Sequence, residues 1–334
     1  MSTTATTIEH APPNRDRGGA RALIQRLRHG DEVAHLVTLT FAAGILLLTS
    51  MLVYELWVNS HLSRAKFGWL FFWTRTWDPI FDNFGASPFI YGTLITSIVS
   101  LVIAVPLGIA AAIFLAELAP RKISDSISFL IDLLAAVPSV IYGLLGIFIV
   151  VPLMRTTIGP LLINTLGHLP YIGKLFKPPN YGVGFFTAGI VLAIMVVPFI
   201  ISVSREVLLT VPRDQREAAL ALGATRWEST WQVVIPWART GILGSIFLAL
   251  ARALGETMAV TMVIGNDPKI TASLLAPGYT IAAVIANEFT EATGDLYLSA
   301  LIELGLVLFL MTFILNGLAR ILIVATERGG GHSS

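Results

Sequence analysis

Cysteine is absent from this 334-residue chain, and charged residues make up only 13% of it. The lack of cysteine excludes disulfide bonds, thiolate metal sites, iron–sulfur ligation and cysteine nucleophiles. Soluble domains carry about 25% charged residues, so the low charge content argues against a soluble fold. With 55% hydrophobic residues and a mean hydropathy of +0.77, the composition is that of an integral membrane protein.

Patterns that bind nucleotides, metals or nucleic acids are also missing. The one Gly-Lys pair, Gly173-Lys174, is followed by leucine and lacks the upstream glycine of a Walker A loop, so we expect this chain to bind no ATP or other cofactor. The histidines are scattered without ligand spacing, and a net charge of +1 provides no basic face for nucleic acid. We predict no metal site, no catalytic residues and no enzymatic activity in this chain.

Six long apolar runs are present, and each reaches about 20 residues, the length that a helix needs to cross a bilayer. We expect them at 33–58, 89–118, 127–154, 183–203, 237–264 and 296–324. The runs are continuous and not alternating, which favours helices over barrel strands, and the first is too long for a signal-peptide core. The predicted fold class is an all-α polytopic integral membrane protein with six transmembrane helices.

Arginine and lysine indicate how the chain is oriented. They concentrate in the N-terminal tail and in the segments that then lie on the same side, which the positive-inside rule assigns to the cytoplasm. We therefore expect a largely disordered cytoplasmic tail over 1–32, a membrane domain over 33–326 and a second cytoplasmic tail over 327–334. The aromatic-rich outside segment 60–87 is interpreted as a membrane-surface anchor, with a docking surface for a partner as the alternative. The other outside loop, 155–181, has no evident role.

The cytoplasmic segment between the fourth and fifth spans has the pattern of two short helices. Pro212 suits a helix start, and the strong helix formers of 213–222 follow it. Gly223 suits a helix end or tight turn. A second short helix is expected over 227–234, before Pro236 marks the entry to the fifth span. Together these residues predict an exposed knob whose small side chains let another surface approach closely.

This segment, 205–236, resembles the EAA loop of ABC-importer permeases, whose pattern is E-A-A, three residues, G, nine residues and I-x-L-P. The matching residues here are Glu217-Ala218-Ala219, Gly223 and Val233-Val234-Ile235-Pro236, with Val in place of Ile and Ile in place of Leu. In that family the loop forms a coupling helix that sits in a groove of a cytoplasmic ATPase. The resemblance implies a coupling role for Glu217, Ala218, Ala219, Gly223 and Pro236; an ordinary amphipathic surface loop is the alternative.

Two apolar segments, 135–146 and 251–260, are similar to the phosphate-transport permease subunits, and nearly all of the chain after residue 30 resembles their PstC type. The resemblance implies the type I ABC-importer permease fold in a bacterial plasma (inner) membrane, and inorganic phosphate as the substrate. It also implies a PstA-type permease partner, two copies of a PstB-type ATPase that bind ATP and Mg²⁺, and a PstS-type phosphate-binding protein. A permease for molybdate or sulfate, or a membrane scaffold that signals phosphate supply, remains an alternative.

Three residues are candidates for the substrate pathway. Arg252 lies about sixteen residues, or roughly 24 Å, into the expected fifth span, and an arginine at the centre of a span costs roughly 2.5–3.5 kcal/mol unless it faces water or a partner. Its planar fork matches phosphate oxygens. Glu256, four residues on, is expected to share its helix face and pair with it; a purely structural ion pair is the alternative. Ser139 is added because Pro138 is expected to kink the third helix.

Overall fold

The computed structural model describes residues 31–170 and 172–329. The predicted tails, 1–32 and 327–334, therefore lie mostly outside the described residues, which do not include 1–30 and 330–334. The chain divides into two compact units at residues 55 and 56, and each is described by itself. The described part of the first unit belongs to helix α2 (Asp31–Asn59), which is apolar over most of its length.

The described residues contain six helical segments long and apolar enough to cross a membrane, and this confirms the predicted fold class. They span Val33–Asn59, Ser87–Leu118, Ser139–Thr165, Phe185–Leu209, Arg226–Leu254 and Asp295–Val324. Apart from two isolated bridges, these described residues contain no strand pairing. The first, second and sixth spans agree with the predicted runs to within two residues at each end.

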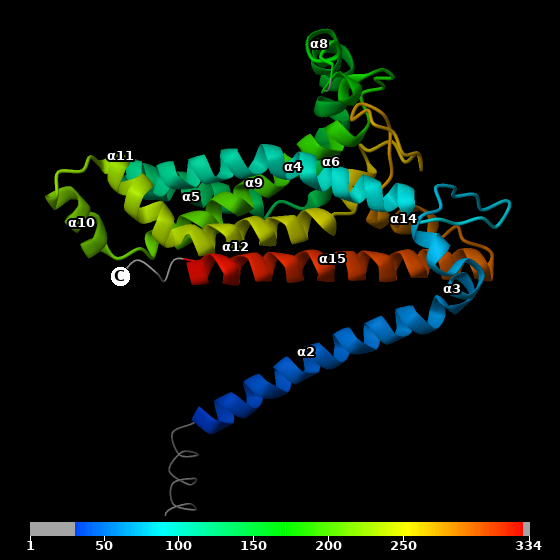
Figure 1. Cartoon of the computed structure of the whole chain (residues 1–334), viewed down its shortest axis with the longest axis horizontal. Coiled ribbons are helices and arrows are strands. Elements are labelled where there is room, and N and C mark those ends of the chain that lie inside the picture. Colours follow the sequence, from blue (N-terminus) through cyan, green and yellow to red (C-terminus); the bar gives the residue numbers. More distant parts are fainter. Residues whose placement is uncertain (1–30, 171, 330–334) are drawn as a thin grey trace, which may run out of the picture. The chain divides into compact units, whose positions relative to one another are not determined.

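Four long helices of the second unit run alongside one another, as Figure 1 shows. They are α4 (Ser87–Ile113), α9 (Phe185–Leu209), α12 (Ile235–Leu254) and α15 (Asp295–Gly329). Helix α9 is the most buried of the spans. Small side chains allow this packing: Gly108 of α4 faces Ile200, and the Ser204 and Ser245 hydroxyls lie 2.7 Å apart between α9 and α12. In this unit α10 and α11 lie at one end of the bundle and α3 and α14 at the other (Figure 1).

The predicted third span, 127–154, is wrong at both ends. Helix α5 (Arg121–Ala135) stops, and α6 (Ser139–Leu145) begins a separate span that continues through α8 (Gly159–Thr165). Pro138 provides the reason, because it lacks an N–H to donate and pushes the residue before it out of the helical region. The apolar run in the sequence hides this break, because α5 is amphipathic and its apolar face supplies hydrophobic residues up to the break.

The predicted fifth span, 237–264, begins too late and ends too late. The span starts at α11 (Arg226–Ser229), passes through the π-helical turn Thr230–Val234 into α12, and stops at Leu254. Pro236 therefore lies in the first turn of α12, where its missing N–H is tolerated, and not at a membrane entry point. After a three-residue break, the short helix α13 covers Met258–Thr261.

At the end of the bundle away from α10, the chain forms shorter elements. They are α3 (His61–Phe67), the 3₁₀ turns Gly68–Phe72 and Ile172–Phe176, and α14 (Ile281–Glu288). Part of the predicted loop 155–181 is ordered against residues 273–274, through hydrogen bonds from Leu274 N to Leu175 O and from Ser273 Oγ to Lys177 O.

The aromatic segment 60–87 divides into buried and exposed rings. Phe71 and Phe84 are fully buried, whereas Trp69 and Trp73 are more than 80% exposed. The Trp77 indole N–H donates to Glu288 at 2.8 Å, which ties this segment to α14. The exposed rings are the type that anchors a protein at a membrane surface.

Candidate functional site

Two interrupted helices meet beside the predicted pathway residues. The first break separates α5 from α6 at residues 136–138, and the second separates α12 from α13 at residues 255–257. Broken helices are tolerated at membrane depth only where they are buried in protein or line a cavity, because their backbone groups need partners. These two breaks therefore mark the part of the membrane domain that is built for something other than spanning.

Close packing of α6 on α13 brings the two breaks together. A Cβ atom added to Gly143 would lie 3.2 Å from the Ala259 Cα, so only glycine lets the two backbones approach this closely. One turn on, Gly146 faces Val263 of the segment after α13 and Val191 of α9. Gly143 and Gly146 therefore serve close helix packing.

Arg252 lies in the last turn of α12, next to the second break, and its side chain is exposed. Its guanidinium carbon is 5.8 Å from the centre of the Phe199 ring, within the range of a cation–π contact. Phe199 lies near the middle of the 25-residue α9, so Arg252 lies beside the middle of the fourth candidate span. The helix C-terminus favours a cation at this position. Among the described residues, Arg252 forms no ion pair within 4.0 Å.

Glu256 does not continue the helix face of Arg252, so the expected pairing through one continuous helix is wrong. Helix α12 ends at Leu254, and Glu256 belongs to the break. Its Oε1 atom accepts a hydrogen bond from the Ala259 N–H at 3.2 Å, so the carboxylate caps the start of α13. The sequence pattern misled because the apolar run continues past the end of α12, where Gly255 forms the C-cap.

Ser139 is the first residue of α6 and is half-buried, but it makes no hydrogen bond to Arg252 or Glu256. Tyr142, one turn further along α6, is the residue that connects the two breaks. Its hydroxyl donates to the Leu134 carbonyl of α5 at 2.6 Å, and it lies close enough to Arg252 to interact with it electrostatically. Tyr142 lies in the apolar segment 135–146 but was not among the predicted pathway residues. The available signal was a tyrosine about one turn after a helix-breaking proline.

Asp132 is a second residue whose role the sequence did not reveal. It accepts a hydrogen bond from the Ser202 hydroxyl of α9. Because Asp132 lies one turn before the end of α5, this bond holds the first break against α9. No sequence signal pairs these two residues, which are 70 positions apart.

The predicted knob is present at the opposite end of the bundle. Helix α10 (Arg213–Ala221) follows Pro212 and contains no buried residue. Glu217 and Ala218 are exposed, Ala219 is half-buried, and Leu222 is 90% exposed. A large apolar side chain that exposed, beside small residues, is typical of a surface that another protein covers.

Local backbone chemistry shapes this knob. Gly223 has φ +91°, a conformation that favours glycine, and a Cβ there would meet no atom within 4 Å, so the requirement comes from the backbone alone. Thr225 and Glu228 then form a reciprocal capping box at the start of α11. The predicted helix end at Gly223 is confirmed.

An ion pair that sequence reasoning missed attaches α10 to the bundle. Arg216 Nη2 lies 2.7 Å from Glu117 Oε1 at the end of the second span, with side chains only 21% and 10% exposed. The same guanidinium donates to the carbonyls of Leu208 and Val211 at the end of α9. The Arg216–Glu117 clamp, as we call this arrangement, borders a polar cavity of about 470 Å³. The clamp therefore ties α10 to the end of the second span and to the end of α9.

Comparison with known proteins identifies relatives of this chain. A family described as "Binding-protein-dependent transport system inner membrane component" matches residues 104–326. The chain is 45% identical to the phosphate transport system permease protein PstC of Mesorhizobium japonicum over 315 residues, which cover 94% of this chain and 96% of that protein. It is 48% identical to the protein of the same description from Pasteurella multocida, over 87% of this chain and 91% of that one.

Solved structures share the fold at low identity. A chain of a bacterial alginate ABC transporter, crystallised with a periplasmic protein bound to alginate pentasaccharide, matches with a TM-score of 0.55 and 15% identity, over 88% of this chain and 96% of that chain. A chain of the inward-facing MetNI methionine ABC transporter matches with a TM-score of 0.54 and 16% identity, over 71% and 94%. Identity this low shows a common fold alone.

Proposed function

The chain belongs to the family of binding-protein-dependent transport system inner membrane components, and from this membership we propose that it is the permease subunit of an ABC importer that moves inorganic phosphate into the cytoplasm. The observation that carries the substrate is the identity of 45–48% with phosphate permeases over most of the chain. The protein is a multi-pass inner membrane transporter subunit with the type I ABC-importer permease fold. ATP hydrolysis takes place on a separate subunit that binds ATP and Mg²⁺.

The pathway lies at the two helix breaks, and Arg252 is its anion contact. Phosphate carries one to two negative charges at neutral pH, and a guanidinium offers it two parallel N–H donors. An arginine at this depth without a carboxylate partner among the described residues leaves those donors to a passing anion. Ser139 and Tyr142 lie one turn apart on α6 and supply hydroxyl groups beside it.

Glu256 acts on the pathway as a positioning residue. Its bond to the Ala259 N–H fixes the start of α13, and the position of Arg252 depends on where α12 ends and α13 begins. In the exchange hypothesis, Glu256 moves to Arg252 when the pathway is empty and releases it to an arriving anion. We would abandon the exchange hypothesis if Glu256→Gln left uptake, anion selectivity and ATPase coupling all unchanged.

The remaining parts of the importer are a PstA-type permease that pairs with this chain, two copies of a PstB-type ATPase and a PstS-type phosphate-binding protein. The exposure of Arg252 and of Met258 on α13 supports a second permease subunit over this face. The exposed α10 knob supports an ATPase below it. Both termini and α10 lie on the cytoplasmic side, and the binding protein delivers phosphate at the end that carries α3 and α14.

The cycle is alternating access. ATP binding closes the ATPase pair, α10 moves with it, and the Arg216–Glu117 clamp carries the movement to α4 and α9, which opens the pathway to the loaded binding protein. Hydrolysis resets the pathway to face inward. The charge of the site alone does not separate phosphate from sulfate or molybdate, so the identity with phosphate permeases decides the substrate.

Radiolabelled phosphate uptake tests the proposal, in cells whose only high-affinity phosphate system contains this chain. We expect uptake by the intact chain to ignore excess sulfate and molybdate, and uptake by Arg252→Gln to fall at least tenfold with normal assembly. Arg75→Gln is the matched control, because Arg75 is an exposed arginine of the segment before α4. Full uptake by Arg252→Gln would make Arg252 structural, and an intact, assembled chain that carries no phosphate would overturn the substrate.

A further inference from the structure

A pocket of about 310 Å³ lies beside the outer part of α15, far from the two helix breaks along the chain. Its walls come from the end of α2, from α3 and the turn after it, and from α15. The residues that line it are Trp57, Arg64, Gly68, Trp69, Phe72, Glu303, Leu306, Val307 and Leu310. Three aromatic rings and three aliphatic side chains make most of this lining apolar, so the two charged residues stand out.

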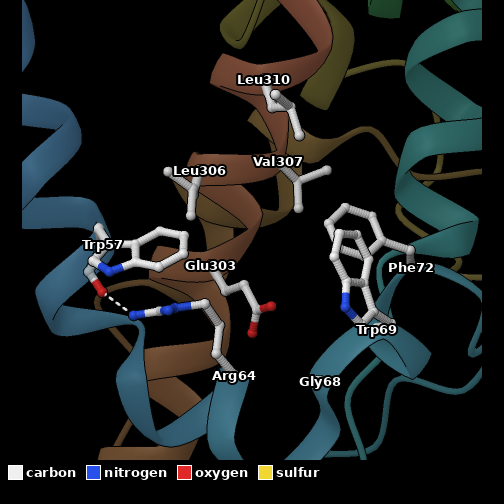
Figure 2. A pocket seen from close by; sticks show the side chains of 9 residues that line it. All are labelled: Trp57, Arg64, Gly68, Trp69, Phe72, Glu303, Leu306, Val307 and Leu310. Atoms are coloured by element: carbon white, nitrogen blue, oxygen red, sulfur yellow. Dashed lines mark hydrogen bonds between the residues drawn. The ribbon is translucent and has the colours of Figure 1, made fainter.

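Glu303 is the first of these charges, and it is 3% exposed. Its Oε2 atom has no hydrogen-bond partner, and Figure 2 shows its carboxylate pointing into the space between Arg64 and Trp69. A buried carboxylate oxygen without a donor is costly, and the one hydroxyl that interacts with this carboxyl group, that of Ser63, forms no hydrogen bond to Oε2. The structure therefore leaves a position for a hydrogen-bond donor next to this oxygen.

Arg64 is the second charge. Its guanidinium stacks on the Trp57 ring at 3.7 Å and donates to Ser60 Oγ and to the Trp57 carbonyl. These bonds use only part of its five N–H groups, and Arg64 forms no ion pair within 4.0 Å among the described residues. The pocket thus holds a fixed positive and a fixed negative group, neither of which neutralises the other by direct contact.

An apolar groove of about 260 Å³ continues from this pocket along α15 towards its C-terminal half. Phe72, Val307 and Leu310 line both, so the two spaces are adjacent. The groove extends to Leu315 against α4. From Glu303 to Leu315 the helix rises roughly 18 Å, which suits an extended acyl chain.

We propose that this pocket and groove bind one phospholipid with a primary ammonium headgroup, of the phosphatidylethanolamine type. The ammonium donates to Glu303 and lies against the Trp69 ring, the phosphate accepts from Arg64, and an acyl chain occupies the groove. The arrangement matches a zwitterion because the pocket lining carries one group of each charge, Arg64 and Glu303. An anionic headgroup would place its charge near the unpaired Glu303, and a choline headgroup has no N–H to donate.

The position in the fold supports a lipid as the occupant. Trp69 and Trp73, which follow α3, are more than 80% exposed, and exposed tryptophans of this kind lie at the headgroup level of a bilayer. The Ser63 N–H bonds Ser299 Oγ and holds α3 on the first part of α15. The pocket is therefore at the membrane surface, where a headgroup enters, and the groove leads towards the bilayer interior. This inference is independent of the transported substrate.

Native mass spectrometry of the full chain, purified with its partner subunits in detergent, tests the proposal. The probes are dioleoyl phosphatidylethanolamine, phosphatidylcholine and phosphatidylglycerol, added one at a time. We expect the intact protein to bind phosphatidylethanolamine about tenfold more tightly than the other two, the effect of one hydrogen bond to a charged group. Glu303→Gln should abolish that preference, while Glu291→Gln, at an exposed acid of the loop before α15, should retain it.

A second pair of variants tests the groove without changing the headgroup contacts. Ile314→Trp should fill the groove and lower binding of all three lipids, whereas Leu318→Trp, at an exposed position of α15 outside the groove, should not. Equal binding of the three lipids by the intact protein, a preference for phosphatidylglycerol, or a phosphatidylethanolamine preference that survives Glu303→Gln would each overturn the proposal.

Discussion

At the scale of single residues, the two arginines Arg216 and Arg252 differ in whether their N–H donors are used within the protein. Arg216 lies against Glu117 and two carbonyls, so its donors are committed to structure. Arg252 lies against an aromatic ring, which stabilises a cation without consuming its N–H donors. The first arrangement suits a joint that transmits force, and the second suits a group that must bind and release an anion.

The Arg216–Glu117 clamp leads to the first residue-scale prediction. Glu117→Gln keeps the shape of the side chain and removes the charge, which should lower the free energy of unfolding by about 1.5–3 kcal/mol, the range for a hydrogen bond to a charged group. Because α10 then moves without α4, we expect phosphate uptake to fall several-fold while ATP hydrolysis continues. Uptake and ATPase activity of the reconstituted complex, with its melting temperature, measure this.

The control for that prediction is Glu206→Gln. Glu206 pairs with Arg205 at 3.0 Å, but its side chain is 71% exposed, and exposed pairs contribute little. We expect normal uptake and an unchanged melting temperature. A Glu117→Gln complex that retains the normal ratio of phosphate carried to ATP hydrolysed would contradict the role of the clamp.

At the scale of elements, the proposed pathway lies where helices are interrupted and not along a continuous helix. The apolar composition of the third and fifth spans predicted two continuous helices, and both are broken where the pathway is proposed. Pro138 interrupts its span because it has no N–H to donate, whereas Gly255 is the C-cap of α12 with an ordinary negative φ. The short α10 is defined in the same way, by Pro212 before it and Gly223 after it.

Gly223→Ala tests whether the shape of the knob matters for coupling. An alanine at φ +91° costs roughly 1–2 kcal/mol of local strain, and no neighbouring atom opposes the added methyl group. We expect the strain to rotate the end of α10, and to lower phosphate uptake and ATPase stimulation by the binding protein together, with assembly intact. Glu217→Ala, at an exposed position of the same helix, should have the same effect through the lost contact.

Gly244→Ala is the matched control for the glycine substitution. Gly244 also has open space around its Cβ position, but it lies inside α12 with an ordinary helical backbone. Alanine there should leave coupling unchanged and stabilise the helix slightly. Normal coupling in both Gly223→Ala and Glu217→Ala would count against α10 as the contact with the ATPase.

At the scale of the whole molecule, the second unit has two ends with different chemistry. One carries the exposed α10 and the Arg216–Glu117 clamp, and the other carries the aromatic segment, α14 and the lipid pocket (Figure 1). The proposed orientation puts α10 in the cytoplasm because the positively charged segments lie at its end. The absence of cysteine makes this orientation directly measurable.

Single cysteines placed at the two ends should label from opposite sides. Thr76→Cys, in the exposed aromatic segment, should react with a membrane-impermeant maleimide in intact spheroplasts, and Lys122→Cys, at the start of α5, should react only in inverted vesicles. The cysteine-free parent chain is the control and should remain unlabelled. Labelling of Lys122→Cys in spheroplasts would reverse the proposed orientation.

The sequence by itself determined the class of fold, four of the six spans to within two residues at one or both ends, and the knob with its terminal glycine. These properties depend on local composition: the length of an apolar run, a proline at a helix start, and a glycine where φ must be positive. The EAA spacing belongs to the same class of signal, because Glu217 and Gly223 lie six residues apart on one short element.

Only the tertiary structure decided how the site is put together. Tyr142 meets Leu134 across a break, Asp132 meets Ser202, and Arg216 meets Glu117 from 99 residues away. It also decided that Glu256 caps α13 and that the Oε2 atom of Glu303 is left without a donor. The physical reason is common to all of these: a partner of a buried polar group is chosen by which helices pack together, and the apolar runs that make helices do not encode their neighbours.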